Sequence, residues 1–321
     1  MAKTSLLQER IVYKPFEYQQ ASDYWLKQQQ AHWLHTEVPM MSDVNDWKQN
    51  LTDSEKNIIG SILKGFAQTE TVVNDYWSTL VTSWFRKPEV IKMAVTFGAF
   101  ETIHAEAYSL LNEELGLDNF SEFLEDEATM AKIEALTTVR DSHDGTPNWH
   151  ERAKSLAVFS AFTEGVNLFS SFAVLLSFKL NNKLKGVGQI VEWSIRDESL
   201  HSEAGCWLFR TLMREHPEFN TPELKADIEE AAKLSLQLEL DFIDKVFEMG
   251  DLAGCPKYDL VSFIKHRVNT KMSDLGIDLE AVKRMKWFDS LSGGKQHTDF
   301  FANRVTNYSK GVQNWDADSL F

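Results

Sequence analysis

Two four-residue stretches, Glu101-Thr102-Ile103-His104 and Glu198-Ser199-Leu200-His201, decide the fold of this chain. Residues i and i+3 share a face of a helix, so each stretch can direct one carboxylate and one imidazole at the same point. A lone glutamate inside an apolar stretch precedes each motif at a similar interval, Glu70 before the first and Glu164 before the second. The order Glu, Glu-x-x-His, Glu, Glu-x-x-His predicts a dinuclear metal site between four helices.

The helix breakers between these positions place the acidic residues at one level. Pro88 lies between Glu70 and Glu101, somewhat nearer to Glu101. In an antiparallel helix pair the heights of these two glutamates above the turn differ by about 5 residues, or roughly 7 Å. Glu164 and the start of the second motif are equally far along the chain from Asn181, where polar residues can turn the chain. The spacing therefore predicts an all-α, ferritin-like bundle with the metal site in its core.

The composition is that of a soluble globular protein. The 321 residues carry a net charge of −15, which argues against nucleic acid as a partner, because phosphate binding requires a cationic face. No apolar run has transmembrane length, and the N-terminus lacks the apolar core of a signal peptide. Two cysteines, Cys206 and Cys255, are too few for a disulfide framework or a thiolate metal site. We expect a cytoplasmic protein that binds neither nucleic acid nor membrane.

Helix signals continue outside the motif pairs. Thr52 and Glu55 fit a capping box at the start of a helix that runs through Glu70 to about residue 85. Residues 1–15 are expected to form a loosely held arm, and residues 32–51 an extended segment. The metal-binding domain is expected to span 1–300, and a flexible tail 301–321. Further helices are expected over about 16–31, 88–115, 149–180, 221–249 and 256–275. Another helix is expected from the turn that begins at Asn181 to about residue 215, and a shorter acidic helix within 117–147.

One Glu-x-x-His alone is weak evidence for a metal site, because chance supplies about one in a chain of this composition. Two such motifs on apolar helices, each preceded by a lone glutamate, are much more specific. Glu164 lies among phenylalanines, where a charge is costly unless it is paired or binds a metal. Carboxylates with one imidazole per metal suit iron or manganese better than zinc or copper.

At these residues the sequence resembles the small, radical-generating beta subunit of class I ribonucleotide reductase, over nearly the whole chain. The resemblance lies in Phe100–Tyr108, in Arg196–His201, in Glu164-Gly165 with the aromatic residues that follow, and in His32–Val38. It implies a set of six metal ligands in a ferritin-like bundle: Glu70, Glu101, His104, Glu164, Glu198 and His201.

The resemblance also implies a route for a radical. Tyr108, four residues after His104, matches the tyrosine that carries the radical in this family. Trp33 would connect through Asp197 to His104. Tyr308 matches the tail tyrosine that passes the radical to the large subunit, and the residues after it would dock on that subunit.

The implied function is that of the beta subunit of ribonucleoside-diphosphate reductase, which is active only together with the large alpha subunit. A dinuclear metal cofactor, activated by dioxygen or superoxide, would store an oxidising equivalent. A relay of tryptophan and tyrosine would deliver this equivalent to the catalytic cysteine of the alpha subunit, where ribonucleotides are reduced to deoxyribonucleotides. The resemblance further implies a homodimer.

Some positions depart from the common family pattern. Glu70 stands where the family often has aspartate, and Leu168 stands where an aromatic residue is common. Four glutamates with two histidines are typical of subgroups in which the metal pair itself is the oxidant. The sequence is most similar to the dimanganese class Id subgroup, which superoxide activates. We expect a dimanganese cofactor, with di-iron or a mixed pair as alternatives, and either Tyr108 or the metal pair as the holder of the oxidising equivalent.

Two other functions are compatible with a metal-binding bundle, because the same fold hosts several activities. A di-metal oxidase or oxygenase would act on a bound organic substrate. It would not need Trp33, Asp197 or a docking tail with a tyrosine. A ferritin-like storage protein would form a cage and take up many metal ions per chain.

Overall fold

The computed structural model describes residues 4–117, 127, 130, 131, 134 and 148–277 of the chain. Within these residues the chain forms helices and turns and no strand, as the sequence predicts. The described residues belong to one compact unit. The predicted tail 301–321 with Tyr308, the predicted boundary at residue 300, and most of the acidic helix expected within 117–147 lie outside the described residues.

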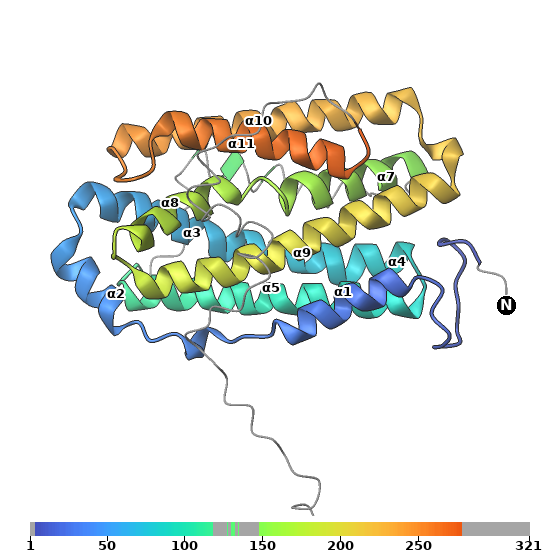
Figure 1. Ribbon diagram of the computed structural model, residues 1–321, viewed down its shortest axis with the longest axis horizontal. Helices are drawn as coiled ribbons and strands as arrows, with labels where there is room; N and C mark the ends of the chain where they lie inside the picture. The colour runs from blue at the N-terminus through green and yellow to red at the C-terminus, as the bar shows by residue number, and fades with distance from the viewer. Residues whose placement is uncertain (1–3, 118–126, 128–129, 132–133, 135–147, 278–321) are drawn as a thin grey trace, which may run out of the picture. The chain divides into compact units, whose positions relative to one another are not determined.

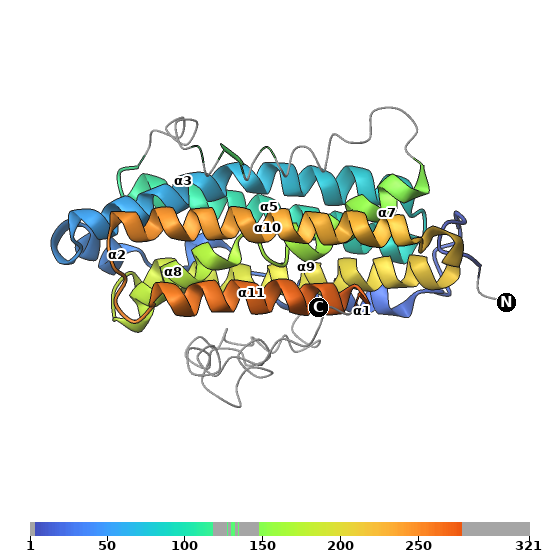
Figure 2. The same ribbon diagram turned by 90° about the horizontal axis from the view of Figure 1, so that it is seen from above.

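Two helix pairs surround the four acidic positions of the sequence pattern. α3 (Asp53–Asp75) packs against α5 (Pro88–Glu114), and α8 (Phe169–Leu180) packs against α9 (Lys185–Glu215). α3, α5 and α9 carry Glu70, Glu101 and Glu198, and Glu164 lies on the turn just before α8. Figure 1 and Figure 2 show that these long helices run alongside one another. Apolar residues of α3 are buried between the helices, among them Ile58, Ile59, Ile62, Leu63 and Phe66.

Further helices cover this centre. α10 (Pro222–Met249) packs against α11 (Lys257–Asp274), and both lie on the side of α7 and α8 (Figure 1). α1 (Gln19–Gln30) contacts α5 and α9. None of the helices in the described part of the chain is long and apolar enough to cross a membrane.

The helix ends follow the local sequence signals. Thr52 caps α3 by accepting a hydrogen bond from the Glu55 N–H, while the Glu55 side chain accepts one from the Thr52 N–H, which confirms the predicted capping box. Pro88 occupies the first turn of α5, where its missing N–H costs nothing. Thr221 caps α10 by accepting a hydrogen bond from the Leu224 N–H.

The expected continuous helix over 149–180 is wrong. α7 (Trp149–Val158) ends in a π-helical segment, η5 (Phe159–Thr163), and a turn over residues 164–168 separates it from α8. α3 likewise continues into a π-helical segment, η3 (Tyr76–Val81), before the short α4 (Thr82–Trp84). No proline in the sequence marks either change. A π-helical segment depends on packing between helices, and such segments frequently occur at functional sites.

The extended segment expected over residues 32–51 is also wrong. It contains η1 (His35–Glu37), α2 (Met41–Asn45) and a π-helical turn, η2 (Asp46–Asn50). These short helices place the buried carboxylate of Asp43 at the start of α9.

Asp43 supplies the cap that α9 lacks in its own sequence. Leu184 precedes α9 in a left-handed conformation and makes no side-chain cap. Asp43 Oδ2 accepts the N–H of Gly186 at 3.0 Å, and its Oδ1 accepts the N–H of Val187 at 2.8 Å. A carboxylate at a helix N-terminus also interacts favourably with the helix dipole.

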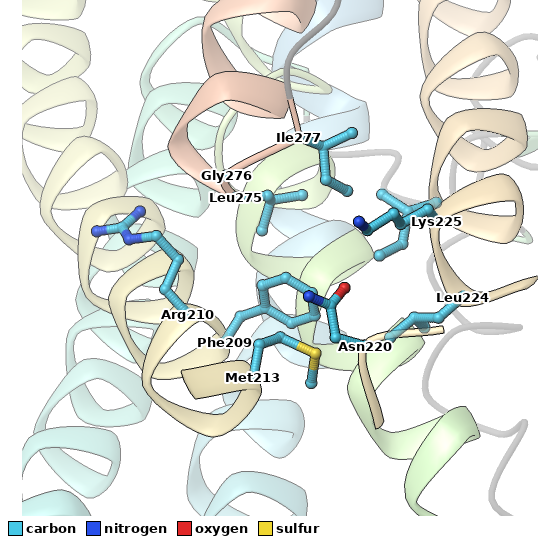
Figure 3. Close-up of a pocket in the computed structure, with 10 residues that line it drawn as sticks. Phe209, Arg210, Met213, Asn220, Leu224, Lys225, Leu275, Gly276 and Ile277 are labelled. Atoms are coloured by element: carbon cyan, nitrogen blue, oxygen red, sulfur yellow. The ribbon is translucent and has the colours of Figure 1, made fainter. Parts of the chain in front are cut away.

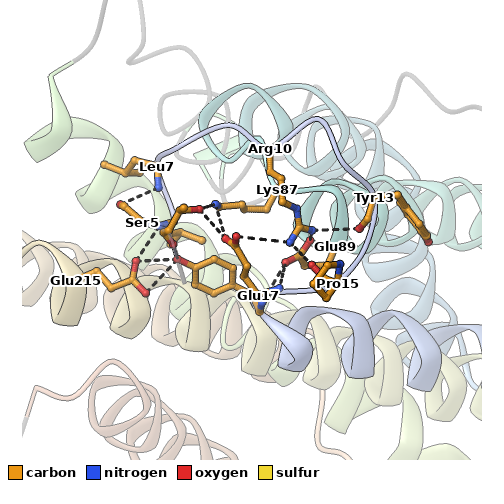
Figure 4. A network of polar contacts seen from close by, with 12 residues as sticks. Ser5, Leu7, Arg10, Tyr13, Pro15, Glu17, Lys87, Glu89 and Glu215 are labelled. Atoms are coloured by element: carbon orange, nitrogen blue, oxygen red, sulfur yellow. Dashed lines mark hydrogen bonds and ion pairs between the residues drawn. The ribbon is translucent and has the colours of Figure 1, made fainter. Parts of the chain in front are cut away.

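The N-terminal arm is not loosely held, contrary to expectation. Residues 5–18 make a network of hydrogen bonds and ion pairs with the start of α5 and the end of α9 (Figure 4). Lys87 is fully buried, and its Nζ lies 2.7 Å from Glu17 Oε2. Glu89 forms an ion pair with Arg10 and accepts hydrogen bonds from the backbone N–H groups of Glu17 and Tyr18. Burial of these charges is tolerated because each has an oppositely charged partner. The linear sequence does not reveal these pairings.

Replacing the buried cap of α9 is expected to destabilise the bundle. Asp43→Ala should lower the free energy of unfolding by about 2–4 kcal/mol, because two buried N–H groups lose their acceptor. Asp43→Asn keeps one oxygen acceptor and should cost about half as much. Urea unfolding followed by circular dichroism measures both. Equal stability of Asp43→Ala and the unsubstituted protein would contradict this role of Asp43.

Candidate metal centre

The structure brings together all six side chains that the sequence singles out as metal ligands. They form two overlapping groups, and within each group one potential ligand atom per residue lies within 4.8 Å of the others. All six side chains are buried. The first group is Glu70, Glu101, His104 and Glu198, and the second is Glu101, Glu164, Glu198 and His201.

The two Glu-x-x-His motifs face each other across α5 and α9. His104 Nδ1 lies 2.9 Å from Glu101 Oε2 on its own helix and 2.9 Å from Glu198 Oε1 on α9. His201 Nδ1 lies 2.8 Å from Glu101 Oε1 on α5. Each imidazole thus reaches a carboxylate of the opposite helix, and Glu101 and Glu198 belong to both groups.

Gly98 lets α5 approach α3 closely, one turn before Glu101. A Cβ atom at Gly98 would lie 3.1 Å from the carbonyl oxygen of Asn74 and 3.2 Å from Ser78 Cβ. A larger residue would therefore push the two helices apart. The close approach places Glu101 beside Glu70.

Glu164 reaches the cluster from the turn over residues 164–168, directly after η5. Its Oε1 accepts a hydrogen bond from Trp77 Nε1, and its Oε2 lies 3.8 Å from His201 Nδ1. Trp77 is not among the residues that the sequence motifs single out. The available signal was its spacing, because Trp77 follows Glu70 by two helical turns.

Burial and like charge shape the electrostatics of the cluster. Burial, followed by the charges of Glu198 and Glu101, raises the pKa of Glu70 well above its usual value. Burial and the neighbouring Glu198 raise the pKa of Glu164 to about 8. For His104 and His201, burial alone would lower the pKa, but Glu101 and the other carboxylates raise it well above the usual value. The cluster without a cation therefore holds protons near neutral pH.

The donor atoms fit a pair of metal ions. Among the described residues, both carboxylate oxygens of Glu70 are buried without a hydrogen-bond donor. Glu101 Oε1 and Glu198 Oε1 lie 2.8 Å and 2.9 Å from the imidazoles of His201 and His104, which are themselves members of the cluster. Buried polar atoms without a partner are costly, so a cation between these carboxylates would stabilise them. Oxygen donors with one imidazole in each group suit manganese or iron.

A hydrogen-bonded chain leads away from His104. Its Nε2 lies 3.3 Å from Asp197 Oδ2, and that oxygen accepts the indole N–H of Trp33 at 2.7 Å. The Trp33 ring also stacks on His104 at 5.7 Å between centroids. Arg196 contacts Asp197 Oδ1 at 3.3 Å. Burial would raise the pKa of Asp197, but the bonds from His104 and the charge of Arg196 hold it below its usual value.

Two more side chains stand next to the cluster. Tyr108 is fully buried, and its ring packs on Phe66 at 4.8 Å. Burial and the nearby Glu70 raise the pKa of Tyr108 well above its usual value, so its phenol stays protonated. Gln28 Oε1 lies 3.1 Å from His201 Nε2 and orients that imidazole. No sequence motif singles out Gln28, because a glutamine on a polar helix carries no signal of its burial.

The described cavities do not adjoin the cluster. One of about 160 Å³ lies where α9, α10 and the end of α11 meet, with Phe209 and Met213 as apolar lining and Arg210 and Lys225 at its border (Figure 3). A second, of about 30 Å³, is lined by residues of α3, the turn after Glu164, α8 and α10. None of the six clustered side chains lines either cavity.

Known proteins are similar to this chain in sequence and in fold. The family model "Ribonucleotide reductase, small chain" matches residues 10–279. The probable ribonucleoside-diphosphate reductase small subunit 048L of Invertebrate iridescent virus 3 is 34% identical, over 96% of this chain and 86% of that protein. The ribonucleoside-diphosphate reductase subunit beta of Chlamydia pneumoniae is 26% identical, over 94% and 91% of the two chains.

Solved structures agree with the bundle. A putative class I ribonucleotide reductase from Bacillus halodurans superposes with a TM-score of 0.78 at 21% identity, over 85% of this chain and 99% of that chain. Dimanganese(II)-NrdF from Streptococcus sanguinis superposes with a TM-score of 0.72 at 21% identity, over 88% and 98%. These likenesses confirm the predicted ferritin-like fold. The family match and the viral relative go further, and this chain belongs to the family of ribonucleotide reductase small chains, the beta subunits of ribonucleoside-diphosphate reductase.

Proposed function

We propose that this chain holds the dinuclear metal cofactor of a ribonucleoside-diphosphate reductase and passes an oxidising equivalent to a large subunit through Trp33. The observation that carries the proposal is the hydrogen-bonded chain from His104 through Asp197 to Trp33, which connects one metal-binding group to an oxidisable side chain. A site for metal storage or for oxidation of a bound substrate has no need of such a connection.

The six clustered side chains would hold two metal ions, one at each of the two groups, and Glu101 and Glu198 belong to both groups. Bound manganese or iron, after activation by dioxygen or superoxide, supplies one-electron oxidation. We propose dimanganese as the cofactor, with di-iron or a mixed manganese and iron pair as alternatives. The donor set supports this choice, because hard oxygen ligands favour these metals.

The residues around Trp33 suit the transfer of an electron together with a proton. Oxidation of an indole makes its N–H acidic, and Asp197 Oδ2 lies 2.7 Å from that nitrogen. The lowered pKa of Asp197 keeps its carboxylate ionised and able to accept the proton. Trp33 itself is buried, so water is kept from its ring.

The remaining parts of the relay rest on the sequence. We propose that Tyr308 continues the path and that residues 301–321 dock on the large subunit. Tyr108 would stand beside the metals, either as the radical itself or as a neighbour of a metal pair that holds the oxidising equivalent. A homodimer and a location in the cytoplasm complete the proposal.

Metal binding is expected to reverse the pH dependence of stability. Without metal, Glu164 keeps its proton up to a pH of about 8, whereas an unfolded chain loses it near 4.5. The raised pKa values of His104 and His201 act in the same direction above pH 6.5. The metal-free protein should therefore lose about 1 kcal/mol of stability per pH unit for each such group between pH 6 and 8.

Thermal unfolding in a chelator at pH 6, 7 and 8 measures this loss. Added Mn²⁺ should raise the melting temperature most at pH 8, because the metal displaces protons. A metal-free protein whose stability rises from pH 6 to 8 would contradict the predicted protonation of the cluster.

The identity of the cofactor is tested by electron paramagnetic resonance on protein activated with manganese or with iron. A coupled dimanganese signal that decays when the large subunit and substrate are added is the expected result. A stable tyrosyl signal would place the oxidising equivalent on Tyr108. More than two metal ions per chain, counted by mass spectrometry, would favour storage.

Replacing Trp33 distinguishes a reductase subunit from a protein that only binds metal. Trp33→Phe keeps the stacking on His104 but removes the indole N–H, so two metal ions per chain should remain while reductase activity with the large subunit is lost. Asp197→Asn should lower activity by about 10–100-fold. Trp149→Phe, whose ring stacks on Phe219 at 5.7 Å outside the cluster, serves as the matched control. Full activity of Trp33→Phe would refute the relay.

Truncation after Tyr308 tests the partner. The shortened chain should bind metal normally and lose reductase activity, whereas an oxidase acting on a small substrate would keep its activity.

A further inference from the structure

Trp77 holds one of the proposed ligands by a hydrogen bond that the reductase reaction does not explain. Its indole is fully buried, and its Nε1–H donates to Glu164 Oε1. We propose that Trp77 is a positioning residue that restricts Glu164 to a single metal-facing oxygen, and so sets the affinity of the second metal position alone. This inference rests on the proposed dinuclear site.

Glu164 differs from the other glutamates of the cluster in what its oxygens contact. Among the described residues, both oxygens of Glu70 lack a hydrogen-bond donor, and Glu198 contacts the imidazoles of His104 and His201 inside the cluster. Glu164 instead accepts a hydrogen bond from Trp77, which lies outside the six residues. An indole N–H is a donor only, so it keeps Glu164 Oε1 directed at Trp77 and engages one of its lone pairs. Oε2, 3.8 Å from His201 Nδ1, is the atom left for a metal.

Glu164 also needs an external anchor more than the other ligands do. Glu70, Glu101 and Glu198 project from continuous α-helices, whereas Glu164 lies on the turn over residues 164–168. The backbone after it is held by a hydrogen bond from Arg267 Nε to the Gly165 carbonyl oxygen. Trp77 provides the corresponding restraint on the side chain.

The indole is itself fixed by its neighbours. The Trp77 ring makes edge contacts with Phe97 at 5.1 Å and with Phe159 at 5.8 Å between centroids. Trp77 lies in η3 and Phe159 in η5, so the two π-helical segments meet beside Glu164. Such insertions shift which side chains face the core, and here they bring the donor and the acceptor together.

Only one of the two metal-binding groups contains Glu164. Glu70, Glu101, His104 and Glu198 form the first group without it, and Glu101, Glu198 and His201 join it in the second. Loss of the Trp77 hydrogen bond should therefore affect the two metals unequally. A defect of folding would instead weaken both.

The experiment is a titration of the metal-free full-length protein with Mn²⁺, in which electron paramagnetic resonance counts the free ion. The unsubstituted protein should bind two ions per chain. Trp77→Phe, which keeps a ring but lacks the donor, should bind the first ion with less than a twofold change and the second about 10–100-fold more weakly.

Tyr76→Phe is the matched control in the same π-helical segment. It removes a buried hydroxyl that bonds to Ser155 Oγ at 2.9 Å, and it keeps the ring that stacks on Phe159. Both metal affinities of Tyr76→Phe should match those of the unsubstituted protein. If Trp77→Phe does not fold, Trp77→Met offers a flexible apolar replacement that also lacks the donor.

Infrared difference spectra on Mn²⁺ binding give a second readout, because the separation of the carboxylate stretches distinguishes one-oxygen from two-oxygen coordination. Trp77→Phe should gain a two-oxygen carboxylate that the Tyr76→Phe control lacks. Equal weakening of both ions, or unchanged binding of both, would overturn the role of Trp77. Fewer than two ions on the unsubstituted protein would instead refute the dinuclear site, and this inference with it.

Discussion

The structure depends on the burial of four carboxylates and two imidazoles at one point inside an apolar bundle. Like charges at this distance repel, and burial penalises each of them, which is why the pKa values of Glu70 and Glu164 are raised. The helices must nevertheless stay close. Gly98 lets α5 approach α3, and Asp43 anchors the start of α9 from a distant segment. Contacts outside the cluster thus hold the helices that carry the acidic residues close together.

The two proposed metal positions differ in their surroundings, although the motifs look alike. On one side His104 is connected through a carboxylate to Trp33. On the other side Glu164 is held directly by Trp77. One indole thus donates to Asp197, which contacts a clustered imidazole, while the other donates directly to a clustered carboxylate. Under the proposed function, this difference would direct electron transfer through Trp33, because electron transfer is favoured where a proton can move as well.

The sequence was sufficient for those parts of the site that a helix itself determines. The i, i+3 spacing of Glu101 with His104, and of Glu198 with His201, places each pair on one face in any α-helix, and the hairpin spacing brings the pairs to one level. Trp77 and Gln28 were missed, because their roles arise from a π-helical offset and from packing between distant helices. The same packing breaks the helix expected over 149–180. That the six residues bind metal, and that Trp33 and Tyr308 carry a radical, stay predictions.

The N-terminal network has a practical consequence for work with this protein. Leu6 and Tyr18 bond to Glu215 at the end of α9, and Arg10 and Glu17 bond to the start of α5 through Glu89 and Lys87 (Figure 4). These are the two helices that carry the Glu-x-x-His motifs, and the network fastens both at the same end. Trimming the N-terminal arm to aid crystallisation, or placing a bulky fusion there, would therefore alter the frame of the metal centre itself. For recombinant work, residues 5–18 belong to the scaffold of the cofactor site.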